Sequence, residues 1–193
     1  MNKFIFTFLL LFCLNSYSKP LFLGDSLTYQ ISYSYNKISP LSALYMSGSG
    51  LSSNRIINWR NYVRKINYSH YDSIYVMLGT NDFISERQKE SYYFKVIYFI
   101  RELKIHSNNK PIIWLLPPPL ADKNKNQLLK NTRNVIINAC LNENVFMIDT
   151  RHALGMGYTE KFNGIPIRTN DGIHITEHGA DRVVGLLFSS VTY

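Results

Sequence analysis

The sequence predicts an α/β domain in which helices cover both faces of a parallel β-sheet. Short apolar runs of strand length alternate with longer stretches of helical character, which is the pattern of repeated βαβ units. The apolar runs are also nearly continuous, as expected of strands that are buried on both faces. Because crossovers between parallel strands are right-handed, the expected architecture has three layers, α/β/α.

Five strands and five helices follow from this pattern. We expect the strands at 20–24, 41–47, 73–79, 111–116 and 144–148. We expect the helices at 27–37, 52–67, 86–107, 123–142 and 176–190. In the third helix, apolar residues recur at helical spacing and are predicted to face the core: Val96, Ile97, Ile100 and Leu103.

The first 18 residues have the pattern of a secretory signal peptide. Lys3 gives a short positive region, residues 4–14 are almost entirely apolar, and Ser16-Tyr17-Ser18 is a small-x-small cleavage pattern. The apolar stretch is shorter than the ~20 residues that a transmembrane helix needs. We therefore expect cleavage after Ser18, one domain over residues 19–193 and no stable membrane insertion.

Composition restricts the possible partners. The chain has two cysteines, so removal of Cys13 with the leader leaves Cys140 without an intrachain disulfide partner. The net charge is +8, but the basic residues are scattered, and no nucleic-acid-binding motif is present. The charge is compatible with a mild preference for an anionic cell envelope. We expect a monomer that binds no nucleic acid.

Polar residues follow several of the predicted strands. The first strand ends in Gly24-Asp25-Ser26, the second runs into the sequence SGSGLSS, and the third runs into GTND at 79–82. In parallel sheets, binding sites form beyond the carboxyl ends of the strands. These exits are therefore expected to form one polar rim at a single edge of the sheet.

Ser26 is the candidate nucleophile on this rim. A serine hydroxyl needs a neighbouring base to take its proton, and the base is usually a histidine oriented by a carboxylate. Asp171 and His174 lie three residues apart before the last helix, and Gly172 allows the chain to turn back between them. We expect this loop to bring His174 to Ser26.

A serine nucleophile also requires hydrogen-bond donors for the oxyanion that develops on the substrate. Three candidates lie on the rim: the Ser26 amide, the amide of a glycine after the second strand, and the Asn81 side chain. One such donor lowers the activation barrier by about 2.7–4 kcal/mol. A glycine suits this position because it has no Cβ to obstruct the substrate.

Four short blocks resemble those of the SGNH, or GDSL, hydrolase superfamily. They are GDSL at 24–27, a glycine near 50, GTND at 79–82 and DGIH at 171–174. Each block alone is weak, but all four occur in the family's order and span nearly all of residues 19–193. The sequences SGSGLSSNRIINW and RTNDGIHIT also resemble an exported bacterial subgroup.

The resemblance implies a fold and a set of site residues. It implies a flavodoxin-like sheet of strand order 2-1-3-4-5, with Ser26 as nucleophile, His174 as base and Asp171 as its partner. It also implies that Gly50 and Asn81 donate to the oxyanion. The neighbouring Gly48 remains an alternative to Gly50. In the exported subgroup an arginine precedes the DGIH block, and the corresponding residue, Arg168, would grip substrate or brace the loop.

Purely structural interpretations exist for each motif. Ser26 or Asp25 could cap a helix, GTND could be a turn in which Asn81 bonds its own backbone, and Asp171-Gly172 is a common turn dipeptide. His174 and His178 have a spacing that binds zinc when both lie on a helix, but the H-E-x-x-H order is absent. The joint occurrence of the motifs favours catalysis without metal or cofactor.

These observations predict an exported serine esterase, either periplasmic or secreted. The expected substrates are small acyl esters, in particular acetyl esters of envelope glycans. Lysophospholipid or thioester hydrolysis, and acyl transfer to a sugar hydroxyl, are alternatives that use the same acyl-enzyme chemistry. A catalytically inactive carbohydrate-binding protein of the same fold is an alternative from another class, which the presence of all the expected site residues disfavours.

Overall fold

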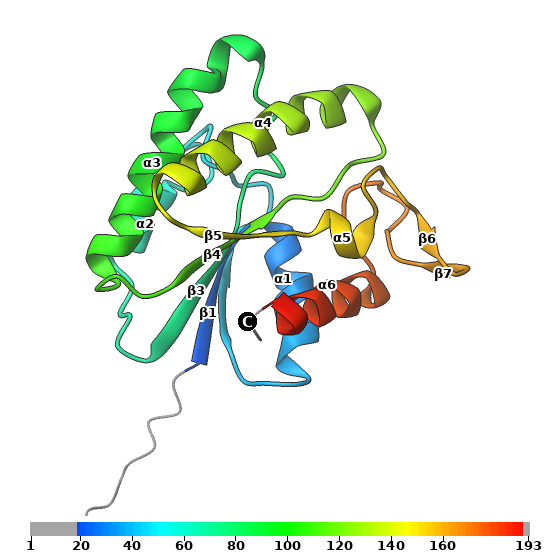
Figure 1. The fold of residues 1–193 in the computed structure, drawn as a ribbon, viewed down its shortest axis with the longest axis horizontal. Coiled ribbons are helices and arrows are strands. Elements are labelled where there is room, and N and C mark those ends of the chain that lie inside the picture. Colours follow the sequence, from blue (N-terminus) through cyan, green and yellow to red (C-terminus); the bar gives the residue numbers. More distant parts are fainter. Residues whose placement is uncertain (1–18, 191–193) are drawn as a thin grey trace, which may run out of the picture.

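A parallel sheet forms the centre of the protein. The computed structural model describes residues 19–190, so the predicted signal peptide at 1–18 lies outside the described residues. The central sheet has five parallel strands in the order β2-β1-β3-β4-β5 (Figure 1). The strands are β1 (Lys19–Gly24), β2 (Ser42–Tyr45), β3 (Tyr71–Met77), β4 (Ile112–Leu116) and β5 (Phe146–Asp149). The predicted fold class and strand order are confirmed.

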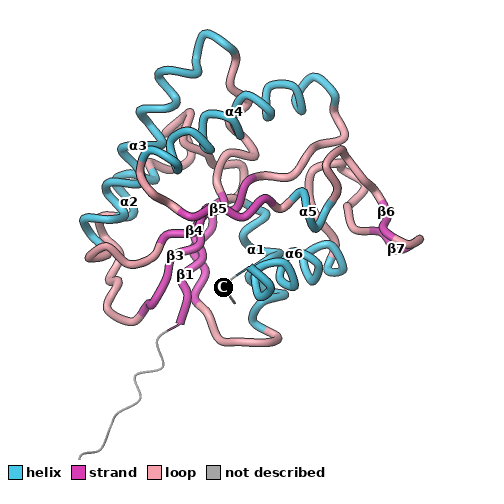
Figure 2. Tube along the Cα trace, viewed as in Figure 1, coloured by secondary structure: helices cyan, strands magenta, loops and turns pink. Residues whose placement is uncertain are grey.

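Helices cover both faces of this sheet (Figures 1 and 2). One face carries α2 (Trp59–Val63), α3 (Lys89–His106) and α4 (Lys123–Asn142). The other carries α1 (Ser26–Asn36), α5 (Arg151–Leu154) and α6 (Glu177–Ser190). The two faces therefore bury two separate apolar clusters, one on each side of the sheet.

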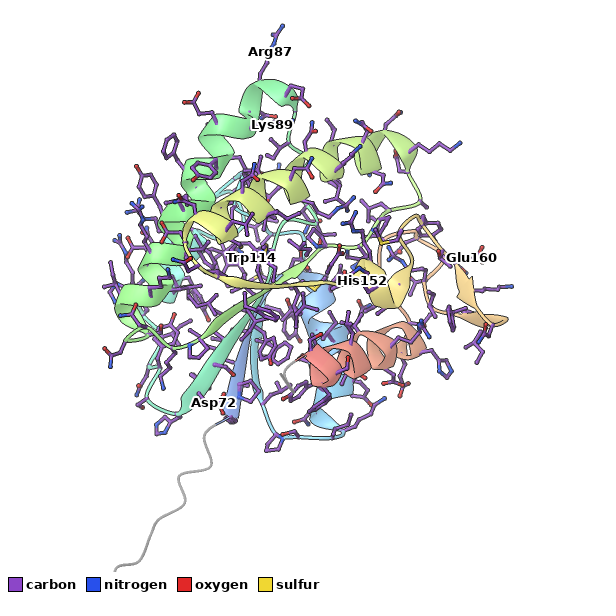
Figure 3. All side chains as sticks on the ribbon, viewed as in Figure 1. Asp72, Arg87, Lys89, Trp114, His152 and Glu160 are labelled. Carbon is purple, nitrogen blue, oxygen red and sulfur yellow. The ribbon has the colours of Figure 1, made fainter. Side chains whose placement is uncertain are left out.

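The strands are apolar on both faces because each face meets one of these clusters. Along β4, Trp114 packs towards α3, where its ring lies edge-on to Phe99 at 5.8 Å, while Leu115 packs towards α6. Figure 3 shows Trp114 in the interior and Arg87 projecting from the turn that precedes α3. The apolar residues predicted to face the core from α3 are buried: Val96, Ile97, Ile100 and Leu103.

The predicted helix over 52–67 is wrong for most of its length. Only Trp59–Val63 is helical, and residues 46–58 form a loop. The carboxylate of Asp82 accepts hydrogen bonds from the amides of Leu51 and Ser52, at 3.0 and 2.7 Å. The helix then begins only where the Asn58 side chain caps it by accepting from the Asn61 amide. Asp82, which is distant in sequence, thus fixes as a loop the segment that sequence periodicity assigned to a helix.

Four smaller elements differ from the prediction. The first residues of the helix predicted at 86–107 form a 3₁₀ turn, η1 (Glu86–Gln88), before α3, and the short α5, which was not predicted, follows β5. The strands β6 (Lys161–Phe162) and β7 (Ile165–Pro166) form an antiparallel hairpin. All four contain too few residues to produce a periodic pattern. No helix within residues 19–190 is long and apolar enough to cross a membrane.

Candidate active site

Ser26 is the first residue of α1, directly after β1. The preceding residue, Asp25, caps the helix, because its side chain accepts a hydrogen bond from the Leu27 amide at 3.0 Å. Asp25 therefore caps the helix, as the purely structural interpretation expected, and Ser26 is nevertheless accessible. Ser26 itself is only partly buried, so its hydroxyl lies at the surface of the sheet's carboxyl edge.

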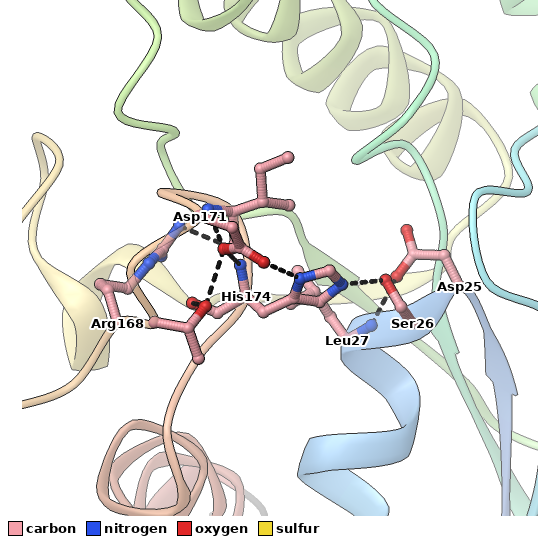
Figure 4. Close-up of polar contacts among 8 residues, drawn as sticks. Asp25, Ser26, Leu27, Arg168, Asp171 and His174 are labelled. Carbon is pink, nitrogen blue, oxygen red and sulfur yellow. Dashed lines mark hydrogen bonds and ion pairs between the residues drawn. The ribbon is translucent and has the colours of Figure 1, made fainter.

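The loop before α6 brings His174 to Ser26 (Figure 4). The Nε2 atom of His174 lies 2.8 Å from Ser26 Oγ, and its Nδ1 atom lies 2.6 Å from Asp171 Oδ2. Gly172 has φ +70°, a conformation that glycine adopts without strain, and it turns the chain so that the carboxylate faces the imidazole of its own loop. Ser26, His174 and Asp171, which come from opposite ends of the sequence, thus form one continuous hydrogen-bond network.

The carboxylate of Asp171 is fixed by several donors. Its Oδ1 atom accepts hydrogen bonds from the amides of Ile173 and His174 and from the hydroxyl of Thr169, at 2.7–2.9 Å. Partial burial acts to raise the pKa of Asp171, but the hydrogen bonds from His174, Ile173 and Thr169 outweigh it and hold the pKa well below its usual value. Asp171 is consequently ionised at neutral pH and can stabilise a positive charge on His174.

Arg168 lies beneath the same loop and is 2% exposed. Its Nη2 atom donates to the carbonyls of Pro119 and Ile173, at 2.7 and 2.9 Å, and its guanidinium lies 5.2 Å from the ring of Tyr158. Burial lowers the pKa of Arg168. Of the two roles considered for this residue, these contacts support bracing of the loop, since the head group faces backbone carbonyls in the interior.

The loop after β2 carries the two candidate oxyanion glycines. Gly48 is exposed and lies in a turn in which the Ser49 amide donates to Met46. Gly50 is buried, and a Cβ at this position would lie 2.1 Å from Asp82 Oδ1. Only glycine therefore fits at position 50, where the loop packs directly against the carboxylate of Asp82.

Asn81 reaches this loop from the exit of β3. Its side-chain nitrogen donates to the Ser49 carbonyl at 2.9 Å, which leaves the second N–H of the amide for another acceptor. The alternative in which Asn81 bonds its own turn is not what the structure shows. Gly50, Asn81 and Gly48 line one hollow together with Arg55 and Ile56.

Two residues that support this loop were not singled out from the sequence. Asp82 receives the two loop amides described above and also the hydroxyl of Tyr92, at 2.6 Å. Burial raises the pKa of Tyr92 well above its usual value, so its phenol remains a donor. Asp82 adjoins Asn81 in the GTND block and offered a signal. Tyr92 lies mid-helix in α3 and offered none.

None of the other histidines in the described part of the chain lines the hollow that contains Ser26. His178, which together with His174 raised the zinc alternative, is exposed on the first turn of α6, while His174 lies in the preceding loop. The two are therefore not on one helical face. Within residues 19–190, no group of three or more His, Cys, Asp or Glu side chains is arranged to hold a metal ion.

The family comparison covers nearly all of the described chain. The model of a family described as "Protein of unknown function (DUF459)" matches residues 20–190. The chain belongs to this family. Together with the fold, this membership confirms the resemblance to the SGNH hydrolase superfamily. A search among curated proteins found no match.

Solved structures share the fold at low sequence identity. A carbohydrate acetylesterase from Sinorhizobium meliloti has a TM-score of 0.69 and 16% identity, over 90% of this chain and 98% of that one. An aryl esterase from M. smegmatis has a TM-score of 0.63 and 16% identity, over 90% and 97%. A peptidoglycan O-acetylesterase has a TM-score of 0.61 and 15% identity, over 78% of this chain and 45% of its own.

Proposed function

We propose that the protein is a serine esterase that hydrolyses small acyl esters, in particular acetyl esters of glycans. The observation that carries the proposal is the 2.8 Å contact between His174 Nε2 and Ser26 Oγ, with His174 oriented by Asp171. The esterase activities named for the similar structures support the same reaction class. The carbohydrate and peptidoglycan acetylesterases among them support the acetyl and glycan specificity.

The first half of the reaction acylates Ser26. Its Oγ attacks the ester carbonyl carbon while His174 Nε2 takes the hydroxyl proton, and the carbonyl π electrons move to the oxygen. The ionised Asp171 stabilises the imidazolium that forms. The negative oxygen accepts hydrogen bonds from the amides of Ser26 and Gly50 and from the Asn81 side chain. When the intermediate collapses, His174 protonates the departing alcohol and Ser26 keeps the acyl group.

The second half returns the enzyme to its starting state. Water enters where the alcohol left, and His174 takes a proton from it as the water oxygen attacks the acyl carbon. Collapse of this second intermediate breaks the bond to Ser26 Oγ, which recovers its proton from His174, and the carboxylic acid departs. Among the glycine candidates we assign the oxyanion donor to Gly50, because it lies beside Asn81 and is held in place by Asp82.

Hydrolysis of p-nitrophenyl acetate by the purified protein tests the proposal. We expect measurable turnover in the wild type and a loss of at least about 10³-fold in kcat for Ser26→Ala, since the nucleophile is removed. Ser91→Ala, which changes an exposed serine on α3, is the matched control and should retain wild-type activity. Activity that survives Ser26→Ala would overturn the assignment of the nucleophile.

We also propose that the protein is exported, with cleavage after Ser18, to the periplasm or the medium. The proposal rests on the positive, apolar and small-residue pattern of residues 1–18. Expression of the full chain in a bacterial host, followed by fractionation and intact-mass measurement, tests it. We expect an extracytoplasmic protein whose mass begins at Lys19. An uncleaved chain that remains in the cytoplasm would refute export.

A further inference from the structure

Exposed tyrosines lie in a row that begins beside Ser26. Tyr29 and Tyr33 follow Ser26 at helical spacing and therefore share its face of α1. Tyr45, at the end of β2, lies against this face, with its ring centroid 5.2 Å from that of Tyr29. The rings of Tyr29 and Tyr33 are 6.5 Å apart. The three side chains, here named the tyrosine row, are 44–58% exposed.

The near end of the tyrosine row forms part of the active-site hollow. Tyr29 and Tyr45 line a hollow of about 450 Å³ together with Ser26 and His174. The other lining side chains are polar: Gln30, Ser47, Thr169 and Asp171. The parallel pairing of Gly24 with Tyr45 explains this placement, because it sets the end of β2 beside the exit of β1 that carries Ser26.

We propose that the tyrosine row binds the sugar chain of an acylated oligosaccharide, with the ester-bearing sugar at Ser26 and neighbouring sugars on Tyr29, Tyr45 and Tyr33. The inference rests on the proposed function, and it assigns the alcohol half of the substrate to a particular surface.

The position of His174 determines which half of the ester meets the row. In the proposed reaction His174 protonates the departing alcohol, so the alcohol oxygen must lie near Nε2. His174 lines the hollow that contains Tyr29 and Tyr45, whereas Gly50 and Asn81 line a different hollow. The alcohol half therefore extends over the tyrosine row, and the carbonyl oxygen faces Gly50 and Asn81.

The chemistry of the surface favours a saccharide over a lipid. A tyrosine offers an apolar ring face and a polar hydroxyl, which match the C–H face and the hydroxyl groups of a sugar. The polar residues that line the same hollow provide further hydrogen-bonding groups. The far end of the row is charged, since Lys37 lies 5.5 Å from the Tyr33 ring and pairs with Glu177 and Asp181.

The length of the row favours an oligosaccharide over a single sugar. Tyr33 lies seven positions after Ser26 in α1, which corresponds to about 10 Å along the helix axis. A monosaccharide seated at Ser26 would contact Tyr29 and Tyr45 but would not reach Tyr33. Dependence on Tyr33 is therefore the specific signature of a bound chain of sugars.

The test compares O-acetylated chito-oligosaccharides of increasing length, from the monosaccharide to the tetrasaccharide, by acetate release. For the wild-type protein we expect kcat/KM to rise with length. Tyr33→Ala should lower kcat/KM for the tetrasaccharide about three- to tenfold relative to the monosaccharide, mainly through KM. Tyr33→Phe, which retains the ring, should restore most of this ratio.

The control is Tyr98→Ala, which removes another exposed tyrosine, from α3 on the opposite face of the sheet, and should leave the ratio unchanged. A flat length series, or an equal effect of Tyr33→Ala on both substrates, would overturn the tyrosine row as a glycan site. A preference of the row for long-chain p-nitrophenyl esters over the sugars would overturn it in favour of an acyl-binding surface.

A binding measurement separates failure of this inference from failure of the proposed function. Unacetylated chitotetraose is titrated calorimetrically into the Ser26→Ala protein, which requires no catalysis. Binding that is weakened three- to tenfold by adding Tyr33→Ala supports the row even if p-nitrophenyl acetate is not hydrolysed. Ester hydrolysis without any binding of the oligosaccharide refutes the row and leaves the esterase intact.

Discussion

Asp25 is a buried carboxyl group directly before the proposed nucleophile. It is fully buried, and although one oxygen accepts the Leu27 amide, the other has no hydrogen-bond partner among the described residues. Burial raises the pKa of Asp25 to about 7, and the nearby charge of Asp82 acts in the same direction. The residue that caps α1 is therefore protonated in mildly acidic solution, at a cost in stability when it ionises.

This raised pKa makes stability depend on pH. Between its usual value of 3.8 and about 7, the folded protein holds a proton that the unfolded chain releases, so the free energy of unfolding falls as pH rises through this range. The total loss is at most about 4 kcal/mol. Asp25→Asn cannot ionise and should lack this loss, so its Tm relative to wild type should increase from pH 4 to pH 8.

Thermal unfolding of both proteins across this pH range measures the effect, and Asp72→Asn provides the control at an exposed aspartate (Figure 3). A difference in Tm between Asp25→Asn and wild type that is constant with pH would show that Asp25 has no raised pKa in the folded protein.

At the level of elements, the loop between β2 and α2 depends on α3. The Tyr92 hydroxyl donates to Asp82, and Asp82 in turn holds the amides of Leu51 and Ser52. Gly50 lies between these contacts and can approach Asp82 only because it lacks a Cβ. The helix thus supports the loop that carries Gly50, the proposed oxyanion donor.

Tyr92→Phe tests this arrangement by removing a single hydroxyl. We expect the free energy of unfolding to fall by about 1–3 kcal/mol, because the buried Asp82 loses a donor. We also expect kcat for p-nitrophenyl acetate to fall several-fold with little change in KM, because the Gly50 amide is less well held in the transition state. Both quantities are measured well below the Tm. Tyr98→Phe on the same helix is the control. An unchanged kcat for Tyr92→Phe would show that Tyr92 does not help to position the Gly50 amide.

At the level of the whole molecule, the sheet connects the two helical layers. Trp114 is fully buried in β4, where its ring packs on Phe99 and its indole nitrogen donates to the Leu78 carbonyl at 3.2 Å. The layer of α1 and α6, which supports Ser26 and the loop of His174, packs on the opposite face of the same sheet. A substitution that destabilises one helical layer should therefore also destabilise the other, because both layers pack on the same strands.

Trp114→Ala should lower the free energy of unfolding by about 3–5 kcal/mol, because it removes a large buried side chain and leaves a cavity. If the domain unfolds as one unit, a single transition at a lower denaturant midpoint will be observed by circular dichroism and by loss of esterase activity. Ile105→Ala, at a position 72% exposed, is the control and should change little. Two separate transitions would contradict the single cooperative domain.

Much of the candidate site was predictable because it lies on strand exits. Ser26 and Asn81 follow apolar runs that were recognised as strands, and the loop with Asp171 and His174 has its turn encoded by Gly172. These are local signals. The missed residues act over distance: Asp82 holds a loop 30 residues away, and Tyr92 is placed beside it by the packing of α3.

The sequence by itself determined the layered fold and the side chains expected at the carboxyl edge of the sheet, while the strand order came from the resemblance of its motifs to a known family. These follow from hydrophobic periodicity and from short motifs, both of which are local along the chain. Only the tertiary structure decided that residues 46–58 form a loop, that Arg168 faces the interior, and that Tyr45 joins Tyr29 beside Ser26. Those outcomes depend on contacts between residues far apart in sequence, which no local pattern records.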